Sequence, residues 1–208
     1  MEDLSPTAAA HQKSLRQLPH SFVRNYLDEI RRCLDQVSEE EVEQVLALLR
    51  EAYHKDRTIF IIGNGGSAST ASHFATDLGK GTSVDGARRF RTMSLTDNAA
   101  LISAVGNDIG FEHIFVEQLK PWLEQGDVLL VISGSGNSPN IVAAVEYARS
   151  RKALTIGLLG FGGGIVKPLL DASIVLPAQH YGHVESVHLV LEHLISNYFM
   201  RELGVPGY

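Results

Sequence analysis

From residue 58 onward, short apolar runs alternate with longer segments in which apolar residues recur at helical spacing. The apolar runs predict strands at 58–62, 90–95, 127–132, 153–158 and 173–176, and the other segments predict helices near 67–79, 98–105, 111–123, 138–150 and 184–203. Strands that are apolar throughout and alternate with helices are typical of a parallel sheet covered on both faces. We therefore predict a single α/β domain over residues 57–208, with a five-stranded parallel sheet in the flavodoxin-like order 2-1-3-4-5.

Two further helices are predicted ahead of the sheet. Residues 21–36 carry apolar positions at helical spacing, and Ser38-Glu39-Glu40-Glu41 is a capping-box sequence that opens a second amphipathic helix. Neither helix carries obvious chemistry, so we assign residues 14–56 to an N-terminal helical extension used in oligomerisation. Residues 1–13 lack periodicity and are expected to be flexible.

Composition narrows the class of protein. The chain has 208 residues and a net charge of −6, which argues against a nucleic-acid partner. Its single cysteine, Cys33, excludes an internal disulfide. The sequence shows no secretory signal and no apolar stretch of membrane-spanning length. We expect a soluble cytoplasmic protein with no membrane partner.

Two glycine- and serine-rich loops carry the clearest chemical signal. Gly63-Asn64-Gly65-Gly66-Ser67 follows the first predicted strand, and Ser133-Gly134-Ser135-Gly136-Asn137-Ser138 follows the third. Each loop opens a helix, and this arrangement points backbone N–H groups at an anion. In the predicted order these two strands are neighbours, so both loops border one crevice at the switch point of the sheet. Ser138 followed by Pro139 also matches a helix N-cap and first turn, so capping accounts for part of the second loop.

The ligand is interpreted as a small phosphorylated metabolite. Neither loop has the lysine of a nucleoside-triphosphate-binding P-loop. Gly63-x-Gly65-x-x-Ala68 also matches a relaxed dinucleotide fingerprint, but Asp97 lies too far along the chain for that motif. A second phosphate-type loop is likewise unexpected for a dinucleotide site.

Histidine and carboxylate residues form a second pattern. His73 and Asp77 stand four residues apart on the first predicted helix of the domain and so share a face. Near the C-terminus, His183, Glu185, His188 and His193 lie within eleven residues. Glu185 and His193 are about 12 Å apart along an ideal helix, so a shared ion needs inward-reaching side chains, a distorted helix or another subunit. The alternative is that these histidines are surface or interface residues.

Together, the two loops, His73-Phe74-Ala75 and Val105-Gly106-Asn107-Asp108-Ile109-Gly110-Phe111 resemble a sugar isomerase (SIS) domain, and more narrowly the phosphoheptose isomerase family. The resemblance covers about residues 20–200. It implies conversion of sedoheptulose 7-phosphate to D-glycero-D-manno-heptose 7-phosphate, a step towards the heptose of surface polysaccharides such as lipopolysaccharide or capsule. It also implies a homotetramer with sites at subunit interfaces and one zinc ion per subunit.

The resemblance also assigns residues. It places the metal ligands at His73, Asp77, Glu185 and His193, and the substrate contacts at Asn64, Gly65, Gly66, Ser67, Asp97, Ser133, Gly134, Ser135 and Ser138, with Asp77 and Glu185 as further contacts. The family commonly has Glu at position 77 and Gln at position 185, so this chain departs from the pattern at two of the four ligand positions. All four side chains nevertheless remain competent zinc ligands.

A mechanism follows as a hypothesis. Asp77 is the base that takes the carbon-bound proton, His193 relays protons between the oxygens, and Glu185 is the rival base. Two alternatives stay open: a non-catalytic SIS sensor or adaptor similar to the SIS protein of replication initiation, and an isomerase of another heptose or octose phosphate. Gly160-Phe161-Gly162-Gly163-Gly164 is interpreted as a flexible connection.

Overall fold

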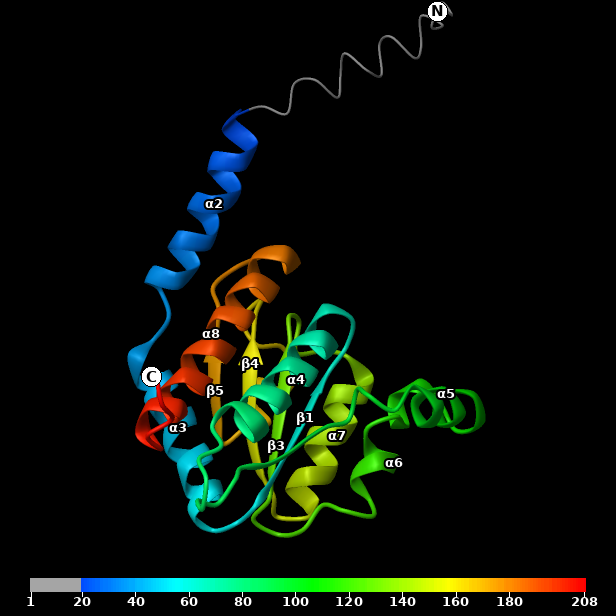
Figure 1. Cartoon of the computed structure of the whole chain (residues 1–208). Coiled ribbons are helices and arrows are strands. Elements are labelled where there is room, and N and C mark those ends of the chain that lie inside the picture. Colours follow the sequence, from blue (N-terminus) through cyan, green and yellow to red (C-terminus); the bar gives the residue numbers. More distant parts are fainter. Residues whose placement is uncertain (1–19) are drawn as a thin grey trace, which may run out of the picture.

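The computed structural model describes residues 20–208, so the segment 1–13 predicted to be flexible lies outside the described residues. In chain order the elements are α2 (His20–Asp35), α3 (Glu39–His54), β1 (Thr58–Gly63), α4 (Gly66–Thr76), a π-helical turn η1 (Asp77–Gly81), β2 (Arg91–Ser94), α5 (Ala99–Asp108), η2 (Phe111–His113), α6 (Val116–Leu119), β3 (Val128–Ser133), α7 (Pro139–Ser150), β4 (Leu154–Leu159), η3 (Lys167–Leu169), β5 (Ala172–Val175) and α8 (Tyr181–Glu202). Figure 1 shows their arrangement.

The predicted sheet is confirmed. Its five strands lie in the order β2-β1-β3-β4-β5, and every neighbouring pair is parallel. Gly63 at the end of β1 pairs with Ile132 near the end of β3. The two glycine/serine loops therefore leave adjacent strands at nearly the same level.

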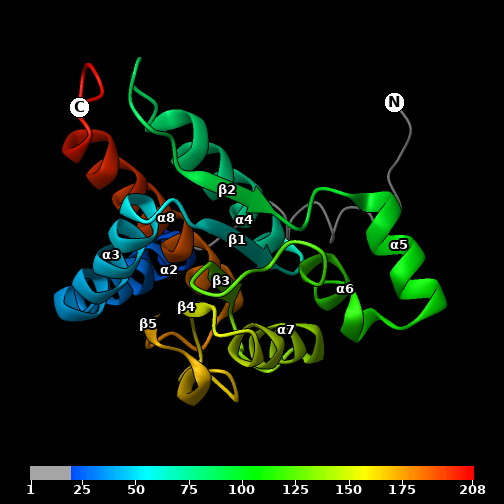
Figure 2. The ribbon, with the colours of Figure 1, turned by 90° about the horizontal axis from the view of Figure 1, so that it is seen from below.

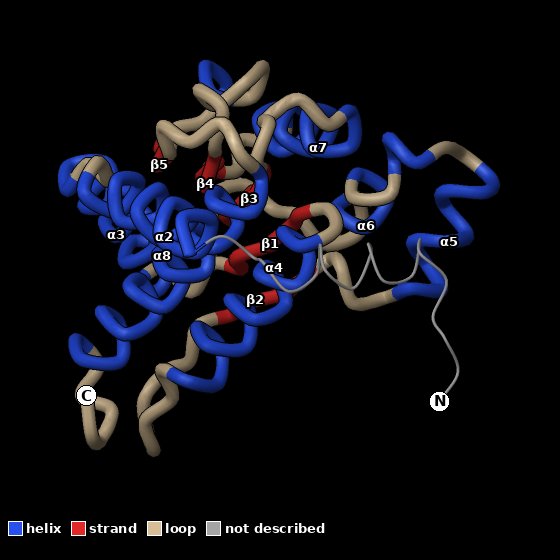
Figure 3. The backbone as a smooth tube through the Cα atoms, turned by 90° about the horizontal axis from the view of Figure 1, so that it is seen from above, coloured by secondary structure: helices blue, strands red, loops and turns tan. Residues whose placement is uncertain are grey.

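Helices cover both faces of the sheet, as the apolar strands predict. Along β3, Val128, Leu130 and Ile132 pack into one core with α3, α4 and α8, while Leu129 and Val131 pack into a second core with α6 and α7. Figures 2 and 3 show the strands between these two layers of helices. The site described below is built on α4 and α8, which lie side by side on the first face.

The N-terminal extension begins with α2, which extends beyond the body of the domain (Figure 1). It contacts the start of α8, where the Tyr26 ring lies edge-on to His183 with 4.5 Å between centroids. Phe22 and Val23 on α2 are 59% and 53% exposed. The predicted cap of α3 is present, because the Glu41 N–H donates to Ser38 Oγ at 3.2 Å.

One predicted helix is much shorter than expected. The pattern predicts a helix near 111–123, but the structure has a single 3-10 turn, Phe111–His113, and the four-residue helix Val116–Leu119. Pro121 explains the early end, since proline has no N–H to donate to the carbonyl four residues earlier. Across the described range 20–208, no helix has the length and apolar character needed to cross a bilayer.

Candidate active site

The two glycine/serine loops enclose a small cavity of about 100 Å³, which we call the cradle. Its lining combines backbone, hydroxyl, amide and carboxylate groups from Asn64, Ser67, Ile132, Ser133, Gly134, Ser135, Ser138, Tyr181 and Glu185. The first loop turns sharply because Gly65 has φ +56°, and α4 starts at the next residue. The N-terminus of α4 therefore lies at the edge of the cradle. The cradle has room for one small anionic group, which a helix N-terminus favours.

The cradle hydroxyls are left free to donate. Ser133 Oγ accepts the Gly136 N–H at 3.1 Å, and Ser135 Oγ accepts the Asn137 N–H at 3.3 Å, so each O–H proton points away from the loop backbone. Ser138 stands at the N-cap of α7, but its side chain makes no capping hydrogen bond. The predicted N-cap position of Ser138, with Pro139 in the first turn, is confirmed, but the cap does not use the hydroxyl, whose donor is available to a ligand.

An amide pair ties the two loops together. Asn64 Nδ2 donates to Asn140 Oδ1 at 2.9 Å, and Asn140 Nδ2 donates to Asn64 Oδ1 at 2.8 Å. Asn140 belongs to the first turn of α7 and is buried. The pair fixes the distance between the first loop and the helix that the second loop opens.

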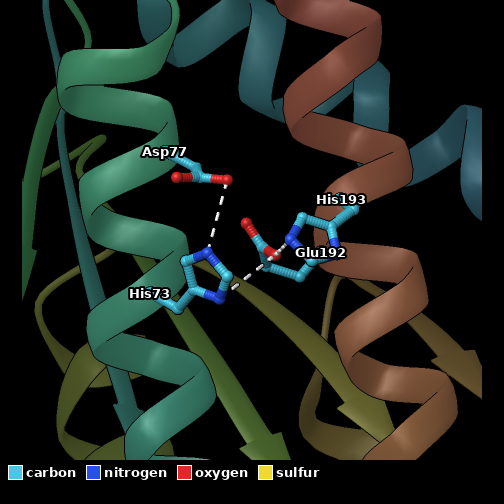
Figure 4. Close-up of side chains that lie close together, drawn as sticks. All are labelled: His73, Asp77, Glu192 and His193. Carbon is cyan, nitrogen blue, oxygen red and sulfur yellow. Dashed lines mark ion pairs between the residues drawn. The ribbon is translucent and has the colours of Figure 1, made fainter.

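A group of four side chains from α4, η1 and α8 lies further along these elements than the residues that line the cradle. His73, Asp77, Glu192 and His193 each offer one donor atom, and these atoms all lie within 4.8 Å of one another. His73 Nε2 is 3.6 Å from Asp77 Oδ2, and Glu192 Oε2 is 3.9 Å from His73 Nδ1 and 3.5 Å from His193 Nε2. Figure 4 shows the four side chains converging between the two helices.

None of these three pairs is within hydrogen-bond distance, and the 3.5 and 3.6 Å separations match two ligands of one ion. His73 faces the two carboxylates with different ring nitrogens, so an ion would use only one of them. Hydrogen bonds between nitrogen and oxygen span about 2.7–3.2 Å, whereas two ligands of a tetrahedral ion held at about 2.0–2.2 Å stand about 3.3–3.6 Å apart. Two imidazoles and two carboxylates are a donor set that suits zinc. The residues present therefore fit a divalent cation.

Glu192 is the most constrained member of the group. Its side chain is fully buried, the Ser196 hydroxyl donates to Oε1 at 3.1 Å, and Oε2 has no hydrogen-bond partner among the described residues. Burial raises the pKa of the Glu192 carboxyl, and the nearby Asp77 carboxylate adds to this effect, whereas His193 and His73 oppose it. A cation beside Oε2 would offset the cost of the buried charge.

Local backbone structure positions the group. The α-helix that starts at Gly66 changes at Asp77 into a π-helical turn, in which the Thr82 N–H donates to Asp77 O at 3.2 Å. Such turns occur frequently at functional sites. The side chains of His73, Asp77 and His193 are 43%, 25% and 46% exposed, so the group opens to solvent on the side opposite Glu192.

The structure brings together three of the four residues predicted as metal ligands. His73, Asp77 and His193 lie in the group, but Glu185 does not. Glu185 lines the cradle and packs against Gly66: a Cβ atom added at Gly66 would lie only 2.6 Å from Glu185 Oε2. Glu192 takes the fourth place in the group.

Sequence reasoning missed Glu192, although a signal was present. Along α8, buried residues recur at Val184, Val187, His188, Leu191 and Ile195, and Glu192 belongs to the same buried stripe. A carboxylate on a buried stripe needs a partner, and that requirement singles it out.

Asp97 does not line the cradle, and its predicted contact with the substrate stays a prediction. It accepts a hydrogen bond from Ser72 Oγ and lines a separate groove of about 570 Å³ beside β2 and α5. Gly65 and Gly66 form the turn into α4, next to the cradle. The remaining predicted contacts, from Asn64 to Ser138, line the cradle itself.

The cradle and the four-residue group are held at a fixed separation. Ser67 at the cradle and His73 in the group are six residues apart on α4, which corresponds to about 9 Å along the helix axis. Glu185 and Glu192 are seven residues apart on α8, or about 10 Å. Both helices therefore run from the cradle to the group.

Comparison with known proteins agrees with this arrangement. The chain matches the SIS domain family over residues 25–160. It is 34% identical to the phosphoheptose isomerase of Citrifermentans bemidjiense over 166 residues, which is 80% of this chain and 86% of that protein. It is 38% identical to the lincomycin biosynthesis protein LmbN of Streptomyces lincolnensis over 189 residues, covering 86% of this chain and 69% of that protein.

A solved structure extends the likeness to three dimensions. The phosphoheptose isomerase of Neisseria gonorrhoeae superposes with a TM-score of 0.78 at 28% sequence identity, covering 90% of this chain and 97% of that one. The chain thus belongs to the SIS domain family and, within it, to the phosphoheptose isomerases, which makes it an isomerase.

Proposed function

We propose that the protein interconverts sedoheptulose 7-phosphate and D-glycero-D-manno-heptose 7-phosphate. The separation between the cradle and the four-residue group carries this proposal. An extended chain advances about 1.2 Å per covalent bond, so the seven bonds from phosphorus to C2 of a heptulose 7-phosphate span about 8 Å. A triose phosphate, with three such bonds, spans about 4 Å and could not reach both places at once.

The metal is proposed to be zinc, held by His73, Asp77, Glu192 and His193. The fit of the four donor atoms and the unpartnered Glu192 Oε2 support this assignment. With the substrate oxygen in place of one of these side chains, a bound divalent cation would polarise the substrate carbonyl and stabilise the negative charge that develops on its oxygen. Glu185, the fourth ligand predicted from the sequence, instead faces the substrate from the cradle side in this proposal.

The chain's own residues hold the substrate and move two protons. The cradle hydroxyls of Ser133, Ser135 and Ser138 donate to the phosphate. Asp77 takes a proton from C1 of the ketose and returns it to C2, while His193 transfers the proton of the C1 hydroxyl to the C2 oxygen. The double bond between C2 and oxygen becomes one between C1 and oxygen, so the aldose forms with atoms and charge balanced.

The remaining predicted properties extend the proposal. We infer that the enzyme works in the cytoplasm on the route to surface-polysaccharide heptose. We infer also that it assembles as a homotetramer, which would cover the exposed Phe22 and Val23 on α2 and Met93 and Trp122 near β2, which are 41% and 62% exposed.

A second candidate substrate has a specific observation in its favour. The relative LmbN is named for lincomycin biosynthesis, and its identity to this chain is 38%. An isomerase of another heptose or octose phosphate is therefore the runner-up. The SIS sensor or adaptor has no use for a metal-binding group, so the four converging side chains argue against it.

The test is direct. Chelator-treated protein is incubated with sedoheptulose 7-phosphate, with and without added Zn²⁺, and the aldose is followed by NMR. We expect zinc-dependent formation of the heptose aldose in the wild type and at least 100-fold slower turnover in Asp77→Asn, with phosphate binding retained. Full activity of Asp77→Asn would remove Asp77 as the base. Turnover of an octulose phosphate alone would favour the second candidate.

A further inference from the structure

Tyr181, the first residue of α8, forms one wall of the cradle. Its ring atoms Cδ1 and Cε1 lie 2.9 and 3.0 Å from the place that a Cβ would occupy at Gly134, so the ring packs directly over the second loop. Tyr181 is 57% exposed and Glu185 follows it by one helical turn. An aromatic ring that lies over the loop and also faces solvent is placed to contact what the cradle binds.

The ring is held by the segment after β4, residues 160–165, which we call the β4 loop. Phe161 stacks on Tyr181 with 4.7 Å between centroids and 48° between planes. The Gly160 N–H donates to Gly134 O at 3.0 Å, and the Ile165 N–H donates to Asn137 Oδ1 at 2.9 Å. The β4 loop is therefore bound to the second glycine/serine loop along its length.

This contact requires an unusual backbone. Phe161 has φ +49°, and Gly162, Gly163 and Gly164 follow with φ of +83°, +91° and +59°. A Cβ at Gly136 would stand 2.0 Å from Gly163 O, so the two loops meet backbone to backbone. Glycine adopts positive φ readily, but a bulky aromatic residue at positive φ is costly and occurs where its surroundings force it. The interpretation of Gly160–Gly164 as a plain flexible connection does not account for Phe161.

The chemistry of the cradle leaves a place for an additional donor. None of the described residues that line it is Lys or Arg, and Glu185 brings a carboxylate to its edge. An anion bound there depends on backbone N–H groups and on hydroxyls. Tyr181 is the one lining residue that can supply a hydroxyl donor from the α8 side.

We propose that Tyr181 is a substrate-contacting residue, whose hydroxyl donates to a phosphate oxygen and whose ring closes the cradle against water, and that Phe161 is a positioning residue that holds this ring. The inference rests on the proposed function for the identity of the substrate, but phosphate binding alone decides it. A hydrogen bond to a charged group contributes enough that its loss weakens binding about tenfold or more.

The first experiment measures the Kd of inorganic phosphate by isothermal titration calorimetry for the wild type, Tyr181→Phe and the control Tyr147→Phe on α7. We expect Tyr181→Phe to bind phosphate about tenfold more weakly and Tyr147→Phe to bind like the wild type. Removing one hydroxyl leaves the ring packing in place, so folding is not at issue. Equal Kd values for Tyr181→Phe and the wild type would overturn the proposed contact.

The second experiment separates positioning from general structure. Phe161→Ala is made alone and in the Tyr181→Ala background. We expect it to weaken phosphate binding several-fold alone and to add nothing when Tyr181 is absent, with kcat unchanged and KM raised wherever turnover is measurable. An equal loss in both backgrounds would refute the positioning role. Phosphate binding with no isomerisation of sedoheptulose 7-phosphate would refute the proposed function and leave the test of Tyr181 intact.

Discussion

Replacing Glu192 by Gln gives the sharpest test of the metal-binding group. The substitution keeps the size of the side chain and removes its charge at a fully buried position. In the wild type, Glu192 Oε2 faces His193 Nε2 at 3.5 Å and His73 Nδ1 at 3.9 Å without a hydrogen-bond partner among the described residues. The substitution is expected to have opposite effects on the stability of the folded protein in the absence and in the presence of a divalent cation.

Without a cation, Glu192→Gln is expected to be at least as stable as the wild type. Burial raises the pKa of the Glu192 carboxyl, so the ionised form destabilises the fold at pH 8 and the neutral amide relieves that cost. With a bound cation, the wild type is expected to be the more stable of the two proteins. Loss of even an outer-shell partner of a metal weakens affinity about 10–100-fold, so loss of a charged ligand is expected to weaken it at least 100-fold.

The expected stability change follows from linkage. Zn²⁺ at 100 times the wild-type Kd stabilises the wild type by about 2.7 kcal/mol, and a variant that binds 100-fold more weakly keeps about 0.4 kcal/mol. For a domain of this size each kcal/mol moves the Tm by about 2–4 °C, so the zinc-induced rise in Tm is expected to be about 5–9 °C smaller in the variant.

The assay is thermal unfolding of chelator-treated protein over a zinc titration. Glu185→Gln is the matched control, because it changes the same residue type on the same helix at the position that the sequence favoured as a ligand. We expect it to keep the zinc-induced rise in Tm. If Glu185→Gln loses that rise while Glu192→Gln keeps it, the geometric assignment of the fourth ligand is refuted.

Three further predictions concern metal binding by Asp77, the pH dependence of stability and backbone strain at glycines. Added Co²⁺ is expected to give Asp77→Asn a weaker visible absorption than the wild type, and an unchanged spectrum would separate Asp77 from the metal. Burial lowers the pKa of His188 to about 4, so below pH 6.5 the unfolded chain binds a proton that the folded chain does not. Stability should therefore fall by about 2 kcal/mol between pH 7 and pH 5 in urea unfolding of the metal-free protein, and His188→Leu should lose this part of the dependence. Gly136→Ala should destabilise by more than 2 kcal/mol because its Cβ would meet Gly163 O at 2.0 Å. Gly204→Ala, at a left-handed position after α8 with open space around it, should cost only the positive-φ strain of about 1 kcal/mol, and equal costs for the two variants would contradict the steric argument.

Most of the fold could be predicted because its cause is local. The strands β1 and β3 are apolar throughout, and parallel strands joined by helices leave few possible orders, so the sheet and both loops were predicted correctly. The helix expected near 111–123 was too long because the apolar periodicity continues past Pro121, whereas proline cannot donate the hydrogen bond that would continue the helix.

The candidate site was only partly predictable. The cradle depends on short loops after adjacent strands, which the sequence displays directly. The four-residue group depends instead on how α4 and α8 are rotated against each other, and on the π-helical turn at Asp77. Periodicity shows that Glu185, Glu192 and His193 share a helix, but only packing decides which of them turns towards His73.

The reciprocal amide pair of Asn64 and Asn140 has a kinetic consequence. Because each side chain both gives and takes one hydrogen bond, the two loops are held at their final spacing before any ligand arrives. An anion then meets a cavity that needs no rearrangement, and its association rate should approach the limit set by diffusion and by the negative net charge of the chain. Raising the ionic strength should therefore speed the capture of a sugar phosphate, the reverse of what a basic anion site would show.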